Sequence, residues 1–334
     1  MHAPDFWSGN TQSLLPPVLA PVALLFDIAT RTRIRLTTPE RLPVPVICVG
    51  NFVAGGAGKT PTALALADMI QSHGLSTAFL SRGYGGSNRQ PLKVDTELHK
   101  AAATGDEPLL LARRAPTFIG VDRRAAAKLA LETGPDCLIM DDGLQNPHLA
   151  KTLSVAVIDA AYGLGNGYVI PAGPLRAALP FQLRLCHALI ILGDGKAADP
   201  AVEAAVHHGL PCFQAQIEIS NLDELQGEPV LAFAGMGRPQ KFFSSLNAAG
   251  IRLIAGKPFP DHHPYSQQEA LNLLAAADKA GAQLATTEKD HVRLRGGGGA
   301  LGELAVRAVP VTAKLRFNSP DAVADFVLSR IRRQ

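Results

Sequence analysis

The sequence has few cysteines, and none are paired in the way that metal sites require. Its 334 residues include four cysteines, all widely separated and without a CxxC spacing: Cys48, Cys137, Cys186 and Cys212. Three of them lie in apolar runs. Disulfide frameworks and zinc sites need paired or closely spaced cysteines. We therefore expect neither, and a reduced cytosolic compartment fits best.

Aromatic residues and net charge are also low. The chain has one Trp and four Tyr, and its formal net charge is +3. Proteins that bind nucleic acid usually have a strongly basic surface and aromatic side chains on which bases stack. No nucleic-acid partner is therefore expected, and no feature implies an obligate protein partner. Because 47% of the residues are hydrophobic, a chain of this length can bury a large core, and we expect two domains.

A long hydrophobic run is missing as well. The uncharged core of the most apolar N-terminal segment, residues 13–26, is about half of the roughly 20 residues that cross a bilayer. No preceding basic residue and no small-residue cleavage site mark it as a signal peptide. Two interpretations stay open: a helix lying in the headgroup region of an anionic membrane, or a helix packed on its own domain. The flanking residues that suit a membrane surface are Phe6 and Trp7 before the segment, and Arg31, Arg33 and Arg35 after it.

Beyond Pro45 the chain alternates apolar runs with helix-forming stretches. Strands are predicted at residues 44–49, 77–80, 117–121, 137–140, 155–159 and 188–192, and helices at residues 61–73, 108–114 and 123–132. Repeated βα units build a mostly parallel sheet with helices on both faces. The fold class is therefore α/β.

A change in composition at residues 221–229 indicates a linker, after which residues 230–234 begin a smaller α/β domain. We expect an N-terminal helical segment at residues 1–40, a larger domain at 41–222, and a smaller domain at 223–334 that is joined by a hinge. The four glycines at 296–299 are predicted to form a surface loop, because no helix is expected after them.

The stretch GGAGKT lies between a predicted strand and a predicted helix. It departs from the usual GxxxxGK[ST] pattern, because Val53 stands where the first glycine belongs. Backbone N–H groups at a helix N-terminus can still wrap an anion, the lysine can neutralise it, and the threonine can hold Mg²⁺. The alternative is a tight glycine turn. The nucleotide-binding residues would be Gly55, Gly56, Ala57, Gly58, Lys59 and Thr60.

The stretch CLIMDDGLQN supplies carboxylates for a metal. Four apolar residues predict a buried strand, and Asp141 and Asp142 follow at its carboxyl end. The same edge of a parallel sheet receives the glycine loop, so the two motifs should face each other across Mg²⁺. Taken alone, the DDG sequence also fits a turn.

Three further stretches carry polar residues beyond what turns need. SRGYGG places Arg82 after a strand, and TGDEP places Asp106 before an apolar helix, where it also fits a helix N-cap. FPDHH groups Asp261, His262 and His263. This group lacks a third spaced ligand for zinc, and a histidine beside a carboxylate suits a proton carrier better.

Eight motifs in this order resemble the tetraacyldisaccharide 4'-kinase family, the lipid A pathway kinases of Gram-negative bacteria. They are GNFVAGGAGKTP, SRGYGG, TGDEP, MDDGLQN, PAGPLR, AGMGRPQKFF, FPDHH and TTEKDHVRL. The resemblance implies phosphorylation, by ATP and Mg²⁺, of the 4'-hydroxyl of tetraacyldisaccharide 1-phosphate at the cytoplasmic face of the inner membrane. It also implies a two-domain phosphate-loop NTPase-like fold and peripheral attachment to an anionic membrane surface through the N-terminal helix.

The resemblance also implies roles for matching residues. Lys59 and Thr60 match the phosphate-loop pair, Asp142 the Mg²⁺ carboxylate, and Asp141 and Gln145 its neighbours in that motif. Arg82 matches an arginine expected to contact the transferring phosphate. Asp106 matches the catalytic aspartate, paired with a histidine that we assign to His262, with His263 as the alternative. Two positions depart from the family pattern: Asn146 replaces a usual His, and Ala177 a usual Glu.

Other functions are compatible with a glycine loop of this kind. A nucleotide-dependent switch ATPase is one, although Ala54 stands where the dimerising members have Lys, and a guanine-reading NKxD is absent. A kinase for a soluble sugar or nucleoside is another, and it leaves the N-terminal segment without a purpose. Deletion of residues 1–35 would separate a soluble-substrate kinase from a membrane enzyme.

Overall fold

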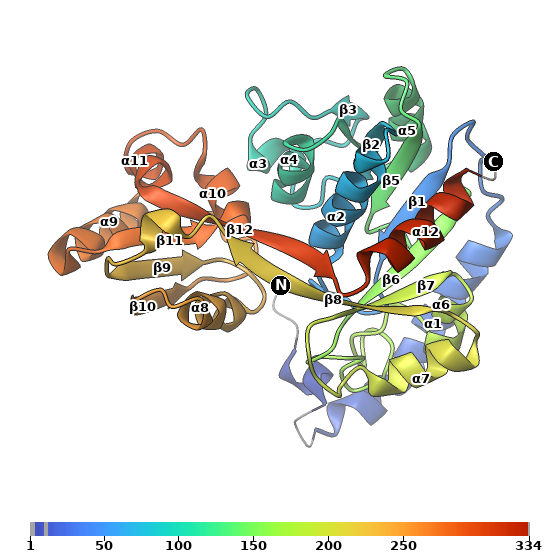
Figure 1. The fold of residues 1–334 in the computed structure, drawn as a ribbon. Helices are drawn as coiled ribbons and strands as arrows, with labels where there is room; N and C mark the ends of the chain where they lie inside the picture. The colour runs from blue at the N-terminus through green and yellow to red at the C-terminus, as the bar shows by residue number, and fades with distance from the viewer. Residues whose placement is uncertain (1–3, 10–12, 333–334) are drawn as a thin grey trace.

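The structure is a computed structural model that describes residues 4–9 and 13–332. Within these residues the strands form one twelve-stranded sheet in the order β10-β9-β11-β12-β8-β7-β6-β1-β5-β2-β4-β3 (Figure 1). The β3–β4 and β8–β12 pairs are antiparallel and the others parallel, which confirms the predicted fold class. The strands are β1 (Val46–Gly50), β2 (Thr77–Ser81), β3 (Leu92–Lys93), β4 (Thr117–Ile119), β5 (Cys137–Asp141), β6 (Leu153–Asp159), β7 (Ala188–Leu192), β8 (Cys212–Ser220), β9 (Val230–Ala234), β10 (Leu253–Pro258), β11 (Gln283–Thr287) and β12 (Ala308–Phe317).

Helices cover both faces of the larger part of the sheet. Alternate residues of β1 face opposite cores, as the two-residue period of a strand requires: Ile47 packs with α2 and α12, whereas Cys48 packs with α7. The helices are α1 (Leu15–Leu36), α2 (Lys59–Ser72), α3 (Ala101–Thr104), α4 (Asp106–Ala112), α5 (Arg123–Leu131), α6 (Leu179–Leu183), α7 (Asp199–His207), α8 (Pro239–Ala248), α9 (Gln267–Ala280), α10 (Glu288–Leu294), α11 (Ala300–Arg307) and α12 (Pro320–Ile331), with short 3-10 turns at Asp5–Ser8 and Asp223–Leu225.

A two-stranded ribbon joins the two parts of the molecule. Strands β8 and β12 pair antiparallel from Thr312 opposite Ser220 to Phe317 opposite Ala215, and Figure 1 shows β9–β11 and α8–α11 on one side of this ribbon. The last helix, α12, returns to the first core. We therefore propose that the second domain is an insertion between β8 and β12, in place of the continuous unit 223–334 expected from the sequence.

The glycine run at 296–299 is followed by a helix, contrary to the prediction. Helix α11 begins at Ala300, directly after Gly299. Gly296 and Gly299 have φ of 76° and 61°, which turns the chain sharply between α10 and α11. The run is a helix–helix connection in the second domain, far in sequence from the phosphate loop.

Helix α1 is longer than the uncharged core that the sequence suggested. It has 22 residues and, by length and composition alone, could cross a membrane, with 17% of its most apolar window buried. Its buried residues are Pro16, Ala23 and Asp27. One side of the helix packs on the protein, and the other exposes apolar side chains.

Candidate active site

The carboxyl ends of β1 and β5 lie side by side. Val49 is opposite Asp141 in the parallel register, so the glycine loop after β1 and the aspartate pair at the end of β5 leave the sheet at one edge. Gly50 permits the close approach of the two loops, because a Cβ at this position would lie 2.4 Å from the Cβ of Leu144. The two motifs identified in the sequence therefore meet where ligands of open α/β sheets usually bind.

The glycine loop leads directly into α2. Gly55 and Gly58 have φ of 110° and 85°, conformations that other residues rarely adopt. Gly56 is exposed and Ala57 is buried between them. Lys59 folds back over the loop, and its Nζ donates a 3.1 Å hydrogen bond to the carbonyl of Gly55. Backbone N–H groups at a helix N-terminus beside an ammonium group are suited to hold phosphate.

Asp141 is buried beside the threonine of the loop. Thr60 Oγ1 donates a 2.9 Å hydrogen bond to Asp141 Oδ2, while Oδ1 is buried without a hydrogen-bond partner in the described part of the chain. Burial, followed by the charge of Glu107, raises the pKa of the Asp141 carboxyl to about 7. A buried carboxylate oxygen without a partner beside a hydroxyl is a set of oxygen ligands that fits Mg²⁺.

Asp142 faces other partners. Its carboxylate accepts two hydrogen bonds from Arg176, of 2.9 and 3.0 Å, and Lys59 Nζ lies 3.8 Å away. Burial raises the pKa of Asp142, but the charges of Lys59 and Arg176 outweigh it and hold the pKa below its usual range. The sequence placed Asp142 first as a metal ligand. In the geometry Asp141 lies closer to Thr60, and Asp142, at 36% exposed, is the more accessible carboxylate.

Gln145 links the aspartate loop to neighbouring segments. Its Nε2 donates 2.9 Å to the carbonyl of Asn51 and 2.7 Å to Gln182, and its Oε1 accepts a 3.4 Å hydrogen bond from Arg176. The side chain expected to bind the cofactor therefore also fixes the shape of the loop. Asn146, at a departure from the family pattern, accepts a hydrogen bond from the backbone of His148.

Arg82 follows β2 and is exposed, and no hydrogen bond or ion pair joins it to another described residue. A second arginine, which the sequence analysis missed, lies nearby. Arg123 is 3% exposed and donates a 2.5 Å hydrogen bond to the carbonyl of Gly120. Burial and then the charge of Arg82 lower the pKa of Arg123 to about 10. Two cations thus lie near the aspartate pair, one of them free to contact an anion.

Asp106 meets the second domain. Asp106 is the first residue of α4. The N-cap of this helix is Gly105 and no side chain caps it, so the prediction that Asp106 is the N-cap is wrong. Its Oδ1 accepts a 2.9 Å hydrogen bond from the backbone of Glu107, and its Oδ2 lies 3.1 Å from Nδ1 of His262. The structure therefore brings together the aspartate and the histidine selected from the sequence, although they are 156 residues apart.

The other residues of the FPDHH motif point elsewhere. His263 Nε2 lies 2.9 Å from Glu269 and does not reach Asp106. Asp261 lies 3.9 Å from Nε2 of His262. Among residues 4–9 and 13–332, no group of three or more His, Cys, Asp or Glu side chains is arranged to hold a metal.

Two cations of α10 complete the cluster and were missed by the sequence analysis. Arg293 donates to Asp106 Oδ2 through Nε, at 2.7 Å, and through Nη2, and Lys289 Nζ lies 3.0 Å from Glu107. Both belong to TTEKDHVRL, in which Lys289 and Arg293 are four residues apart and so share one helix face. The spacing could have indicated a pair of cations on one helix face. It could not have shown that their partners are Asp106 and Glu107, which lie in the other domain.

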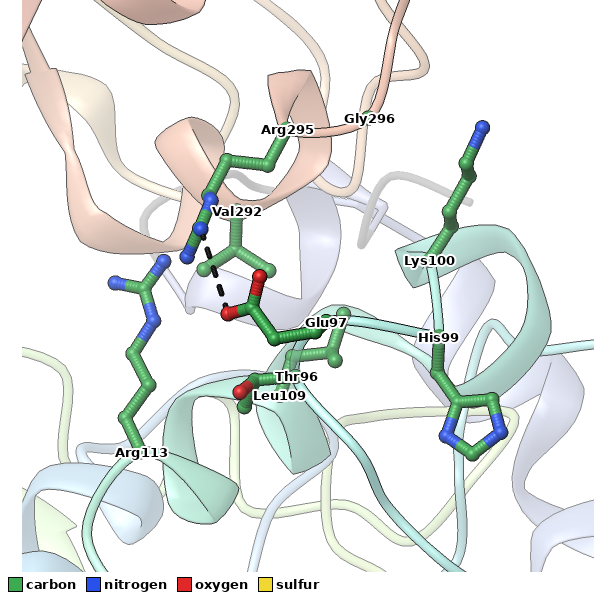
Figure 2. Close-up of a pocket in the computed structure, with 9 residues that line it drawn as sticks. All are labelled: Thr96, Glu97, His99, Lys100, Leu109, Arg113, Val292, Arg295 and Gly296. Carbon is green, nitrogen blue, oxygen red and sulfur yellow. Dashed lines mark ion pairs between the residues drawn. The ribbon is translucent and has the colours of Figure 1, made fainter.

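The domains touch at two further places. Arg238 and Lys241, near the start of α8, lie 2.9 and 2.6 Å from Asp159 at the end of β6. A cavity of about 190 Å³ also lies between the domains, where Leu109 of α4 and Val292 of α10 line it. Figure 2 shows Arg295 of the second domain paired there with Glu97 of the first. The structure is thus a closed arrangement of the two domains.

Comparison with known proteins gives one family. A family model described as tetraacyldisaccharide-1-P 4'-kinase matches residues 15–332. A protein named tetraacyldisaccharide 4'-kinase from Methylobacterium sp. (strain 4-46) is 48% identical over 97% of this chain and 95% of its own length. A protein of the same name from Parvibaculum lavamentivorans is 44% identical over the whole of both chains. The crystal structure of LpxK from Aquifex aeolicus in complex with ATP superimposes with a TM-score of 0.74 at 25% identity, covering 95% of this chain and 100% of the other. The chain therefore belongs to the tetraacyldisaccharide 4'-kinase family.

Proposed function

We infer that this protein is a kinase that transfers the γ-phosphoryl group of ATP to the 4'-hydroxyl of tetraacyldisaccharide 1-phosphate, giving lipid IVA in lipid A biosynthesis. Family membership over nearly the whole chain identifies the activity. The observation that carries the chemistry is the pairing of Asp106 with His262 across the domain interface. Burial raises the pKa of Asp141, and Glu107, the residue after Asp106, is close enough for its charge to raise the pKa of that carboxyl further.

The phosphate side of the reaction needs positioning and neutralisation of charge more than covalent chemistry. We assign the phosphates to the backbone of the glycine loop with Lys59, and the transferring group to Lys59 and Arg82. The residues that would hold Mg²⁺ are Thr60, Asp141 and Asp142, and the bound ion would neutralise charge on the phosphate oxygens. Arg82 is suited to its part because it is exposed and unpaired among the described residues.

The acceptor side needs a base, because a sugar hydroxyl is a poor nucleophile. We assign the proton of the hydroxyl to Asp106, with His262 fixing the orientation of that carboxylate through Nδ1. A positioned base contributes a factor of about 10² to 10⁴ to the rate. Since the two residues come from different domains, closure assembles the pair and also keeps water away from ATP.

Transfer of ³²P from γ-labelled ATP to tetraacyldisaccharide 1-phosphate in detergent micelles tests this function. We expect a Mg²⁺-dependent radiolabelled lipid product that is lost in Lys59→Ala, because the lysine lies over the phosphate loop. A folded protein that binds or slowly hydrolyses ATP without labelling the lipid would instead support the switch ATPase. That alternative gives no role to the Asp106–His262 pair.

We also propose that α1 attaches the enzyme to the cytoplasmic face of the inner membrane as a peripheral protein. One side of the helix exposes large apolar residues, and a lipid with four acyl chains cannot leave the bilayer cheaply, at about 0.8 kcal/mol per CH₂. The exposed apolar residues of the helix are Leu15, Val18, Val22, Leu24, Leu25, Phe26, Ile28 and Leu36. Trp7, expected as a membrane anchor, instead donates its indole N–H to the carbonyl of Pro171 at 3.1 Å.

The inner side of α1 supports the active-site loops. Asp27 accepts a 2.8 Å hydrogen bond from the backbone of Ala178, and Arg33 lies 3.4 Å from the carbonyl of Gln145. Arg176, which binds Asp142, is two residues before Ala178. Deletion of residues 1–35 would therefore disturb the site as well as the membrane contact, and it does not separate a membrane enzyme from a soluble one.

Charge on the outer side of α1 makes a cleaner test. Leu24→Glu and Leu25→Glu, at 57% and 66% exposed, should each weaken binding to vesicles that contain anionic lipid by about tenfold or more, because burial of a leucine contributes about 1.5 to 3 kcal/mol. Sedimentation with the vesicles measures this. Val306→Glu in α11, at 87% exposed, adds the same charge away from the helix and should leave vesicle binding unchanged. Equal binding by all of these variants would contradict attachment through α1.

A further inference from the structure

The carboxylate of Asp106 is enclosed by groups from the second domain. Its Oδ2 takes three donors, namely His262 Nδ1 at 3.1 Å and the Nε and Nη2 of Arg293, and Lys289 Nζ lies 3.9 Å away. The side chain is only 3% exposed. One carboxylate oxygen offers about two acceptor positions. In this arrangement Oδ2 is therefore saturated, and a substrate hydroxyl has no access to it.

Arg293 is held in place by its own domain. Its side chain is 7% exposed, and Nη1 donates to the carbonyl of Gly235 at 2.7 Å and to Asp290 at 2.6 Å. Asp290 is fully buried and also accepts a 2.9 Å hydrogen bond from Tyr265. The guanidinium is thus a built part of the second domain, with one edge bound internally and the other directed at the first domain.

We propose that Arg293 determines when Asp106 can accept a proton: in the closed enzyme without acceptor it occupies Oδ2, and it gives up this contact when the sugar hydroxyl enters. The inference rests on the proposed kinase function. In the productive step the hydroxyl proton passes to Asp106, the hydroxyl oxygen forms a bond to the γ-phosphorus, the bond from that phosphorus to the bridging oxygen breaks, and ADP leaves. Arg293 is a positioning residue in this step, because it acts through Asp106.

The arrangement protects ATP when no acceptor is bound. Water that enters the closed site finds Asp106 buried and its Oδ2 saturated with donors, and a carboxylate in such a pairing is a weak base. Burial raises the pKa of Asp106, but the hydrogen bond from His262 and the charges of Lys289 and Arg293 outweigh it and hold the pKa well below its usual range. The charged and titratable groups that face this cluster come from both domains. They are His262, Asp261, Tyr265, Lys289, Asp290 and Arg293 from the second domain, and Glu107 of α4 and Tyr84, which lies edge-on to the ring of His262, from the first.

The test compares two reactions of the full-length enzyme at pH 8, ³²P transfer to the acceptor lipid and ATP hydrolysis without it. For Arg293→Gln we expect the ratio of hydrolysis to transfer to rise about tenfold or more, because Oδ2 of Asp106 loses the two donors that cover it. A purely structural arginine would lower both reactions together and leave the ratio unchanged.

Arg295→Gln is the matched control. It removes an arginine two residues further along that also crosses the interface, to Glu97 at 3.7 Å, without contacting Asp106, so the ratio should stay at the wild-type value. If Arg293→Gln lacks the wild-type circular dichroism spectrum, Arg293→Lys is judged by the same ratio. A parallel fall of both reactions, with the ratio unchanged, would overturn the proposal. Absence of transfer in the wild-type enzyme would contradict the proposed kinase function itself.

Discussion

Asp106→Asn is expected to lower the rate of phosphoryl transfer by about 10² to 10⁴, the contribution of a positioned general base. The amide keeps the shape of the side chain but cannot take the hydroxyl proton. The change also leaves Arg293 facing a neutral group, and loss of one partner of a buried ion pair costs about 3 to 5 kcal/mol. Folding lowers the pKa of Asp106, so its stabilising contribution is present at neutral pH and is lost as the pH falls below about 4.

Glu107→Gln is the matched control for this prediction. Glu107 is the next residue and pairs with Lys289 across the same interface at 3.0 Å, but at 30% exposed it makes a weaker contact. We expect transfer within about tenfold of wild type, since a partly exposed ion pair contributes about 1 kcal/mol or less. Circular dichroism and ATP binding report folding in both variants. Full activity of a normally folded Asp106→Asn would refute the assignment of the base.

Asp141→Asn is expected to lower Mg²⁺-dependent transfer strongly and to stabilise the metal-free protein. Folding raises the pKa of Asp141 to about 7, above its value of about 4 in the unfolded chain. The folded state therefore binds the extra proton between these values, and the free energy of unfolding falls as the pH rises through this range. Removing the charge removes that cost. Transfer should fall by about 10² or more, because a metal ligand contributes several kcal/mol.

Thermal unfolding at pH 8 without and with Mg²⁺ measures both effects. Without the ion, Asp141→Asn should unfold about 2 to 4 °C above wild type for each kcal/mol gained, and added Mg²⁺ should stabilise wild type alone. Asp142→Asn should behave in the opposite way and lower the unfolding temperature, because the pKa of Asp142 is held down by Lys59 and Arg176. A lower unfolding temperature for Asp141→Asn without Mg²⁺ would contradict this account of the site.

The strands of the buried sheet were predictable from local sequence. The apolar runs at Ala188–Leu192 and Val230–Ala234 have the predicted bounds, because a strand buried on both faces needs an uninterrupted apolar run. The ribbon strands β8 and β12 were not predicted. They carry polar residues on an exposed side, as in Arg316 opposite Gln216, and they pair over a separation that no local pattern reports.

The residues of the candidate site also fall into those that a local motif predicts and those that it does not. The glycine loop and the aspartate pair were found because each is a short motif at the end of a strand. Arg293 and Lys289 were not, because their partners lie on α4 in the other domain. The choice between His262 and His263 also depends on geometry: with φ of 57° at His262, the chain turns so that only this histidine faces Asp106.

The return of α12 to the first core sets the order in which the chain can fold during synthesis. Val323, Val327 and Ile331 complete the apolar cluster that contains Ile47 and Leu66, and all three follow the second domain in the sequence. The second domain lies entirely between β8 and β12, so its residues leave the ribosome earlier. Domains usually fold in the order of their sequence. Here the first domain can complete its core only after the second domain has been synthesised, because α12 is made after it.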